Sequence, residues 1–91
     1  QYPVKTKGRC CDNIQYLQEY DKENNTELAR TLLGFLEYKF NVSETAKALY
    51  IHRNTLINRL GKIKELLYND LEAMDDLMPL CMEAYAYKLF S

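Results

Sequence analysis

Apolar residues recur every three or four positions along most of the chain, the spacing that gathers them on one face of an α-helix. The clearest example is the series Leu28, Leu32, Phe35 or Leu36, and Phe40. No run of Val, Ile or Thr alternates with polar residues, and no Asn-Gly or Asp-Gly turn occurs. The pattern therefore predicts helices and offers no obvious place for a strand.

Polar breaks divide the pattern into five predicted helices. Asn24 and Glu27 have capping-box spacing before the second helix, and Asn41 or Ser43 can cap the third. Pro79 is tolerated only near the first turn of the last helix. We therefore expect an all-α, five-helix domain. Its helices are predicted at residues 12–20, 26–40, 44–50, 53–67 and 76–90.

The chain length limits the number of domains, since 91 residues leave room for one hydrophobic core. With 47% hydrophobic and 27% charged residues and no apolar run near the 18 residues of a membrane span, the chain reads as globular. We expect residues 12–91 to form the domain and residues 1–11 to be a flexible start or a linker from an upstream region missing here. No secretory signal is visible, so we expect a cytoplasmic protein.

The cysteines suggest no chemistry. Cys10 and Cys11 are neighbours, Cys81 lies far away in an apolar stretch, and His52 is the single histidine. These spacings match neither a disulfide framework nor a zinc site, so we interpret them as reduced cysteines, with Cys81 in the core. No carboxylate pair, activated nucleophile or phosphate-binding Gly loop is visible either. The sequence therefore predicts no enzyme, no metal and no cofactor.

Residues 43–59 have the layout of a helix-turn-helix: a short helix, a brief connection and a longer helix. Such a turn needs a small residue in the first helix where the second crosses it, and an apolar residue that fills the corner. It also needs an apolar residue in the second helix that points back toward the first. Ala46, Ile51 and Leu56 fit these roles in that order. At Tyr50, where many such turns have Gly, a positive φ would be costly.

The longer helix is amphipathic. Its apolar residues fall within about 60° of a helical wheel and are expected to face the core: Leu56, Leu60, Ile63 and Leu67. The opposite side carries amides, a hydroxyl and cations, which bond base edges and phosphates, and a helix N-terminus also attracts phosphate. Lys47, Lys62 and Lys64 are expected to supply charge. The candidate DNA-binding residues are Ser43, Thr45, Lys47, His52, Arg53, Asn54, Thr55, Asn58, Arg59 and Lys62.

Charge placement supports this interpretation. The net charge of −1 and pI near 5.8 would by themselves argue against a nucleic-acid partner. Residues 43–64, however, hold five cations and one anion, whereas residues 10–42 and 65–91 are both acidic. Two alternatives remain: a polar face that is merely solvated, and a helical protein-interaction or oligomerisation module that does not bind DNA.

Three segments also carry a resemblance: "NNTELARTLLGFL" at 24–36, Asn41, and "SETAKALYIHRNTLINRLGKIKEL" at 43–66. Together they resemble the C-terminal helix-turn-helix of PucR/CdaR-type bacterial transcription regulators, named for purine catabolism and sugar diacid control. The string at 51–56 and the following Arg59-Leu60 are its most specific part. The resemblance covers about residues 16–90. The chain is similar, more distantly, to the DNA-binding end of the factor for inversion stimulation and of enhancer-binding activators.

The resemblance implies a cytoplasmic bacterial transcription factor that binds double-stranded DNA. Its effector would bind a sensing domain upstream of this chain. An aromatic residue at Tyr50 is usual in the family. Two positions depart from the pattern: Asn58 replaces a common Tyr, which can alter base preference, and Gly61 lies mid-helix. The matched DNA-facing residues are His52, Arg53, Asn54, Thr55 and Arg59.

The last predicted helix is apolar nearly all round, because only Glu83 and Lys88 are charged between residues 77 and 90. One interpretation is a central core helix. The other is a two-fold interface of a homodimer, since operator-binding proteins are commonly dimeric. That interface would use some of Met78, Met82, Tyr85, Tyr87, Leu89 and Phe90.

Overall fold

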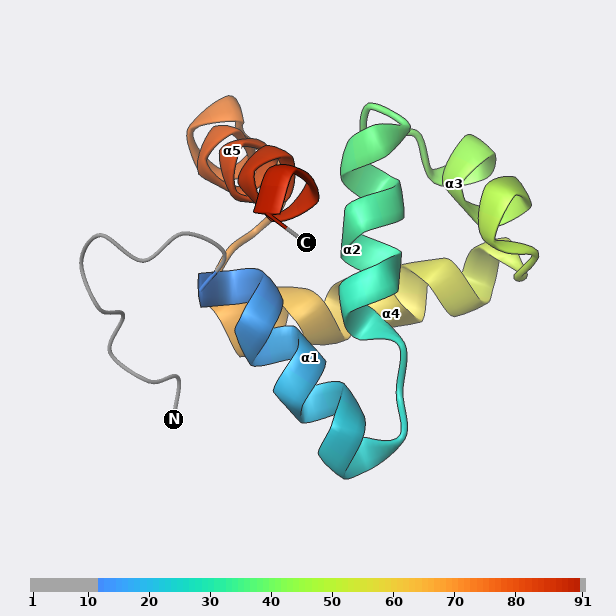
Figure 1. Ribbon diagram of the computed structural model, residues 1–91. Helices are drawn as coiled ribbons and strands as arrows, with labels where there is room; N and C mark the ends of the chain where they lie inside the picture. Colours follow the sequence, from blue (N-terminus) through green and yellow to red (C-terminus); the bar gives the residue numbers. More distant parts are fainter. Residues whose placement is uncertain (1–11, 91) are drawn as a thin grey trace.

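The computed structural model describes residues 12–90, and within them all regular structure is α-helical (Figure 1). The predicted linker, residues 1–11, lies outside the described residues. The all-α, five-helix prediction is confirmed for the described part, and residues 53–67 form a helix with the predicted bounds. The helices are α1 (Asp12–Asn24), α2 (Leu28–Glu37), α3 (Val42–Leu49), α4 (Arg53–Leu67) and α5 (Met74–Phe90).

The central element is α2, which packs against each of the other four helices. Its residues Leu32 and Phe35 are buried in one core with Leu17 of α1 and Leu56 of α4. Figure 1 shows α3 and α5 on opposite sides of α2. The fifth helix is therefore peripheral, and its interpretation as the central core helix is wrong.

The corner between α1 and α2 differs from the prediction. The polar stretch after Tyr20 was expected to be a connection, but α1 continues through it to Asn24. Asp21 then caps the next helix: its carboxylate accepts hydrogen bonds from the backbone N–H groups of Leu28 and Ala29, each at 2.9 Å. The capping-box prediction is wrong, because the side chain of Asn24 donates to the carbonyl of Tyr20 instead.

The end of α2 also differs, because the helix stops at Glu37 rather than at Phe40. Lys39 and Phe40 adopt left-handed backbone conformations with φ of 57° and 66°. The N–H of Phe40 donates to the carbonyl of Phe35 at 2.8 Å, and their rings lie 5.7 Å apart. The Phe40 side chain thus packs against the core because the chain reverses direction after α2, and not because α2 continues to Phe40.

The fifth helix begins two residues earlier than predicted, so Pro79 lies in its second turn. Leu77, Leu80 and Ala84 form its buried face. On the same side of α5, Tyr87 accepts a hydrogen bond from the Gln18 side chain at 2.7 Å. Among the helices of residues 12–90, none is both long and apolar enough to cross a membrane.

Candidate nucleic-acid interface

The first helix of the helix-turn-helix begins at a side-chain cap. Asn41 accepts a hydrogen bond from the N–H of Glu44 at 2.9 Å, which confirms Asn41 as an N-cap. The helix therefore starts at Val42, two residues before the predicted start. Ser43 lies in its first turn and is exposed rather than serving as the cap.

The turn closes through the backbone of Tyr50, which takes a left-handed conformation with φ of 59°. The N–H of Tyr50 bonds to the Lys47 carbonyl at 3.2 Å, and the N–H of Ile51 bonds to the Ala46 carbonyl at 3.0 Å. These two bonds form a Schellman motif, for which Gly is the usual residue. Packing of the Tyr50 ring does little to offset the cost of this backbone conformation, since the residue is 92% exposed.

Packing across the turn agrees with the predicted roles. Ala46 and Leu56 are buried, and Ile51 is partly buried against the core. The four predicted core positions of α4 are all buried: Leu56, Leu60, Ile63 and Leu67. The apolar stripe of α4 thus holds the helix on α2 and α3, and this leaves its other side free to face a partner.

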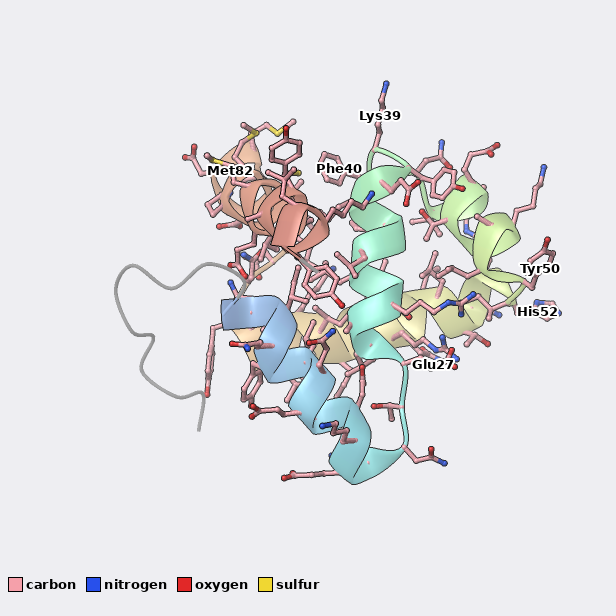
Figure 2. The ribbon with its side chains drawn as sticks, viewed as in Figure 1. Glu27, Lys39, Phe40, Tyr50, His52 and Met82 are labelled. Carbon is pink, nitrogen blue, oxygen red and sulfur yellow. The ribbon has the colours of Figure 1, made fainter. Side chains whose placement is uncertain are left out.

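The polar side chains of α3, the turn and the first half of α4 form the surface that we call the reading surface. Asn54 and Asn58 are exposed one turn apart on α4, and Thr55 beside them is half-buried. In Figure 2, Tyr50 and His52 project from the turn at the far end of the molecule from Met82. The reading surface consists of Ser43, Lys47, His52, Arg53, Asn54, Thr55 and Asn58.

Thr45 has to be removed from the candidate set. Its side chain is fully buried, and its hydroxyl donates to the Asn41 carbonyl at 2.7 Å. The residue lies beside Ala46 on the inward side of α3, so it secures the start of that helix and offers no atom to a partner.

Three predicted cations have partners within the chain. The Lys62 ammonium lies 3.8 Å from the carboxylate of Glu65, and 5.8 Å from the centre of the Tyr20 ring. The Lys64 ammonium lies 4.0 Å from the carboxylate of Glu72. These contacts draw both lysines toward the rest of the domain.

Arg59 is the third, and its guanidinium is directed toward α2. Its Nη1 donates to the Thr31 hydroxyl at 3.3 Å and lies 3.7 Å from a carboxylate oxygen of Glu27. The side chain is 27% exposed. Arg59 therefore braces α4 against α2 at the edge of the reading surface.

Lys47 and Arg53 differ from these three. Both are exposed, and among the described residues neither has a carboxylate within the 4.0 Å of an ion pair. They lie on either side of the turn, Lys47 in the last turn of α3 and Arg53 at the N-terminus of α4, where the helix dipole is positive. Four exposed cations have no ion pair among residues 12–90, and two of them, Lys47 and Arg53, lie in the helix-turn-helix, whereas Lys22 and Lys39 lie outside it.

Sequence reasoning missed Ile57. Its side chain is 46% exposed on α4, on the solvent side next to Asn54 and Asn58. The helical wheel contained the signal, because Ile57 falls outside the arc of the four core residues. An exposed aliphatic group among amides can contact a thymine methyl, so Ile57 joins the candidates for base contact.

Gly61 lies on the same exposed side. A Cβ atom added there would meet no atom within 4 Å. The glycine therefore makes no room for a neighbour inside the domain, and the space beside it opens to solvent.

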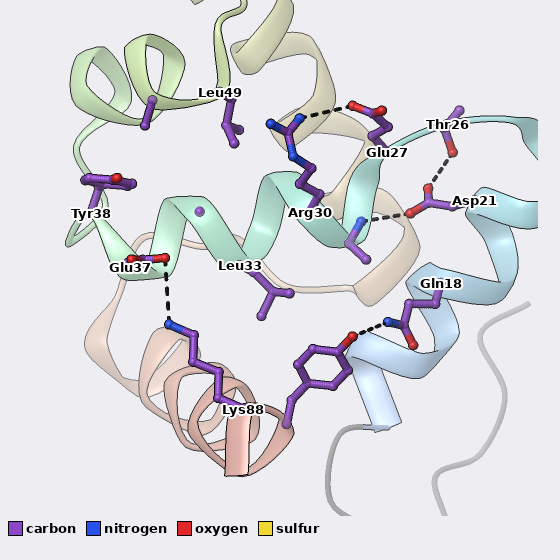
Figure 3. Close-up of a pocket in the computed structure, with 14 residues that line it drawn as sticks. Gln18, Asp21, Thr26, Glu27, Arg30, Leu33, Glu37, Tyr38, Leu49 and Lys88 are labelled. Carbon is purple, nitrogen blue, oxygen red and sulfur yellow. Dashed lines mark hydrogen bonds and ion pairs between the residues drawn. The ribbon is translucent and has the colours of Figure 1, made fainter. Parts of the chain in front are cut away.

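A second feature is an open hollow of about 550 Å³ bordered by α1, α2, α3 and α5 (Figure 3). Charged side chains that line the hollow form ion pairs with one another. Arg30 lies 3.3 Å from Glu27, and Lys88 lies 3.7 Å from Glu37. No group of three His, Cys, Asp or Glu side chains that could hold a metal ion occurs among residues 12–90. The reading surface is therefore the better candidate site.

Comparison with protein families gives one match. The model of the PucR C-terminal helix-turn-helix domain matches residues 28–84, from the start of α2 to the middle of α5. The match contains the whole reading surface. No solved structure matches the chain.

The curated relatives that match the chain include the following three. The purine catabolism regulatory protein of Bacillus subtilis (strain 168) is 41% identical over 78 residues, 86% of this chain and 14% of the relative. The carbohydrate diacid regulator of Escherichia coli (strain K12) is 46% identical over 54 residues, 59% of this chain and 14% of that protein. The DNA-binding transcriptional activator AdeR of Bacillus subtilis (strain 168) is 34% identical over 68 residues, 75% of this chain and 16% of the relative. The chain thus spans a small part of each relative's length.

Proposed function

The chain belongs to the PucR C-terminal helix-turn-helix domain family, and we propose that this DNA-binding domain of a transcription regulator inserts α4 into the major groove of a specific duplex sequence. The observation that carries the proposal is the reading surface. It combines exposed amides on the first two turns of α4 with two cations, Lys47 and Arg53, that have no ion-pair partner among the described residues.

The side chains divide into two roles. Asn54, Thr55 and Asn58 are the candidates for reading base edges, since an amide can bond adenine in two places and Thr offers a hydroxyl and a methyl. The exposed Ile57 beside them is the candidate for contact with a thymine methyl. Lys47 and Arg53 contact phosphates on either side of the groove, and the N-terminus of α4 adds a partial positive charge. Ser43 and His52 lie where further phosphate contacts are expected.

Arg59 has a different role from the one that its residue type suggests. Its guanidinium is held by Thr31 and Glu27, so α4 keeps a fixed angle to α2. A base contact would require Arg59 to leave both partners. We infer that Arg59 positions the recognition helix and that direct reading falls to the amides, with Lys62 as a more distant phosphate contact.

The remainder of the regulator is inferred from the relatives. Each of them is about six to seven times longer than the matched segment, and two are named for purine and carbohydrate diacid control. We infer that effector binding belongs to a segment other than this domain. We also propose that the regulator is bacterial, cytoplasmic and not an enzyme.

The rival function is a helical interaction module whose basic helix binds an acidic protein. The relative named as a DNA-binding transcriptional activator favours DNA. The two functions differ in their response to base sequence, because a protein partner supplies acidic groups but no base edges.

Selection from a pool of random duplexes tests the proposal. The chain is expected to enrich one motif and to bind it roughly 10³-fold more tightly than non-specific duplex. Asn58→Ala is expected to relax preference at one base position, and Glu19→Ala, an exposed change on α1, serves as the control. Enrichment of no motif over repeated rounds would overturn the proposal.

A further inference from the structure

The outward side of α5 carries a continuous apolar stripe. Its five residues follow one another at steps of four, four, three and four, which places them on one face of the helix. Each is between 51% and 68% exposed. The stripe consists of Met74, Met78, Met82, Tyr85 and Leu89. In Figure 2 the side chain of Met82 points away from the body of the domain.

This stripe differs from the dimer interface predicted from the sequence. It gains Met74, because α5 begins earlier than predicted, and it loses Tyr87, which faces α1. The side chain of Phe90 lies outside the described part of the structure. Met78, Met82, Tyr85 and Leu89 remain from the predicted set.

The stripe has no partner within the described fold, because α5 already packs through its other face. Leu77, Leu80 and Ala84 are buried there. The carboxylate of Glu83 accepts hydrogen bonds from the backbone N–H and the side chain of Asn13. The apolar residues left outside are large and adjacent, the kind of patch that marks a protein-interaction site.

We propose that the stripe pairs with the stripe of a second copy of this chain, in an antiparallel arrangement with the two-fold axis near Met82. The spacing is nearly symmetric about this residue. Met78 and Tyr85 lie four and three positions from it, and Met74 and Leu89 lie eight and seven positions from it. Antiparallel pairing therefore sets Met82 against the partner's Met82, Met78 against Tyr85, and Met74 against Leu89.

Charge favours this orientation over a parallel one. The first turn of α5 is acidic, with Asp75 and Asp76, and the last turn carries Lys88. An antiparallel pair keeps the two acidic first turns at opposite ends of the contact and opposes the two helix dipoles. A parallel pair would place both acidic first turns, each with an exposed Asp75, at the same end of the contact. The stripe between these ends carries no charge.

The size of the stripe sets the expected strength. Met74 and Leu89 are separated by about 22 Å along the helix axis at about 1.5 Å per residue. A contact of this length is below the ~1,600 Å² that typical stable complexes bury. The chain by itself is therefore expected to exchange between monomer and dimer at micromolar concentration.

Pairing through the stripe does not itself require DNA binding. Only the purpose of the dimer rests on the proposed function, and that purpose is to bring two reading surfaces to one operator. The stripe lies at the end of the molecule opposite the turn (Figure 2), so pairing leaves Asn54 and Asn58 exposed in both copies. Dimerisation is measured without DNA. A failure of one proposal is thus separable from a failure of the other.

Sedimentation equilibrium of the chain and of Met82→Glu is the first test. The unchanged chain is expected to show a dimer at about 100 µM, and the two carboxylates at the axis should weaken association at least tenfold. Tyr50→Glu, the same kind of change at an exposed aromatic away from the stripe, should leave association unchanged. Thermal unfolding checks that both variants fold. A strict monomer, or equal effects of both changes, would overturn the proposal.

Cysteine cross-linking tests the register, in a background where Cys10, Cys11 and Cys81 are replaced by Ser. Met82→Cys is expected to form a disulfide dimer alone. Met74→Cys is expected to form one only when mixed with Leu89→Cys. Efficient cross-linking of Met74→Cys with itself would indicate parallel pairing and contradict the proposal, as would random cross-linking at all three positions.

Discussion

The guanidinium of Arg59, on the proposed recognition helix, lies 3.7 Å from the carboxylate of Glu27 at the N-cap of α2. The same Arg59 nitrogen donates to the buried Thr31 hydroxyl at 3.3 Å. The Arg59 charge beside the reading surface thus has a partner within the domain, a carboxylate that also pairs with Arg30. Within the reading surface, the cations without an ion pair among residues 12–90 are Lys47 and Arg53, on either side of the turn.

Glu27→Gln tests this balance. Because the carboxylate competes with phosphate for Arg59, its removal is expected to raise duplex affinity up to about fivefold, or about 1 kcal/mol, the range of an exposed ion pair. The slope of log K against log salt should steepen by about 0.9 if Arg59 then contacts one phosphate. Fluorescence anisotropy at several salt concentrations measures both.

Glu37→Gln is the matched control, because Glu37 lies 3.7 Å from Lys88 at the other end of α2. It removes the same charge from the same helix and should change affinity much less. Equal gains from both variants would mean that total charge alone matters. A loss of affinity in Glu27→Gln would mean that Arg59 has to stay in place.

Asp21→Ala is expected to lower the free energy of unfolding by about 1–2 kcal/mol, since it removes the cap of α2. The carboxylate accepts from the N–H groups of both Leu28 and Ala29. Asp21→Asn keeps one of the two oxygens and should fall between Asp21→Ala and the unchanged chain. Chemical denaturation measures all three. A loss under about 0.5 kcal/mol in Asp21→Ala, typical of an ordinary surface change, would contradict the capping role.

Tyr50→Gly is expected to raise the free energy of unfolding by up to about 1 kcal/mol. The left-handed backbone at Tyr50 costs a side-chain-bearing residue energy that Gly does not pay, and the exposed ring contributes little packing. Tyr50→Ala keeps the strain and should not stabilise the domain. Thermal unfolding of both variants decides the point, and a Gly variant no more stable than the Ala variant would refute the assignment of strain.

Gly61→Ala is expected to stabilise the domain by about 1 kcal/mol, because a helix-interior Gly is replaced where an added Cβ meets open space. Duplex affinity should stay within about twofold, since the N-terminal turns of a recognition helix make the base contacts. Denaturation and anisotropy are measured on the same preparation. Reduced affinity with increased stability would show that DNA approaches the backbone at Gly61.

The sequence predicts best what nearby residues determine. The bounds of α4 agree because its buried stripe, from Leu56 to Leu67, and its polar first turn are local features. The start of α2 was missed because its cap, Asp21, lies in the preceding helix and acts only when the two helices meet. The reversal at Phe40 was missed because its apolar side chain also fits a continuing helix.

The candidate site shows the same division. Amphipathic spacing is enough to identify Asn54 and Asn58 as exposed, but a charge count cannot tell which cations are paired. Arg59 meets Thr31 across 28 positions of sequence, a contact that depends on how α4 crosses α2. Thr45 was wrongly assigned to the DNA-facing side. The helix α3 has only eight residues, so its sequence contains too few buried positions to show which side faces the core.

The most direct test of the central claim is the affinity of the chain for its selected duplex and for a scrambled duplex, measured from about 50 to 200 mM salt. The account predicts a clear preference for the selected duplex at every salt concentration. Replacing Lys47 or Arg53 by Ala should lower affinity for both duplexes and reduce the salt slope by about 0.9 each. Replacing Asn54 and Asn58 by Ala should greatly reduce the preference and leave the slope unchanged. Equal binding of both duplexes by the unchanged chain, or no binding of either near 50 mM salt, would contradict the claim that α4 reads DNA.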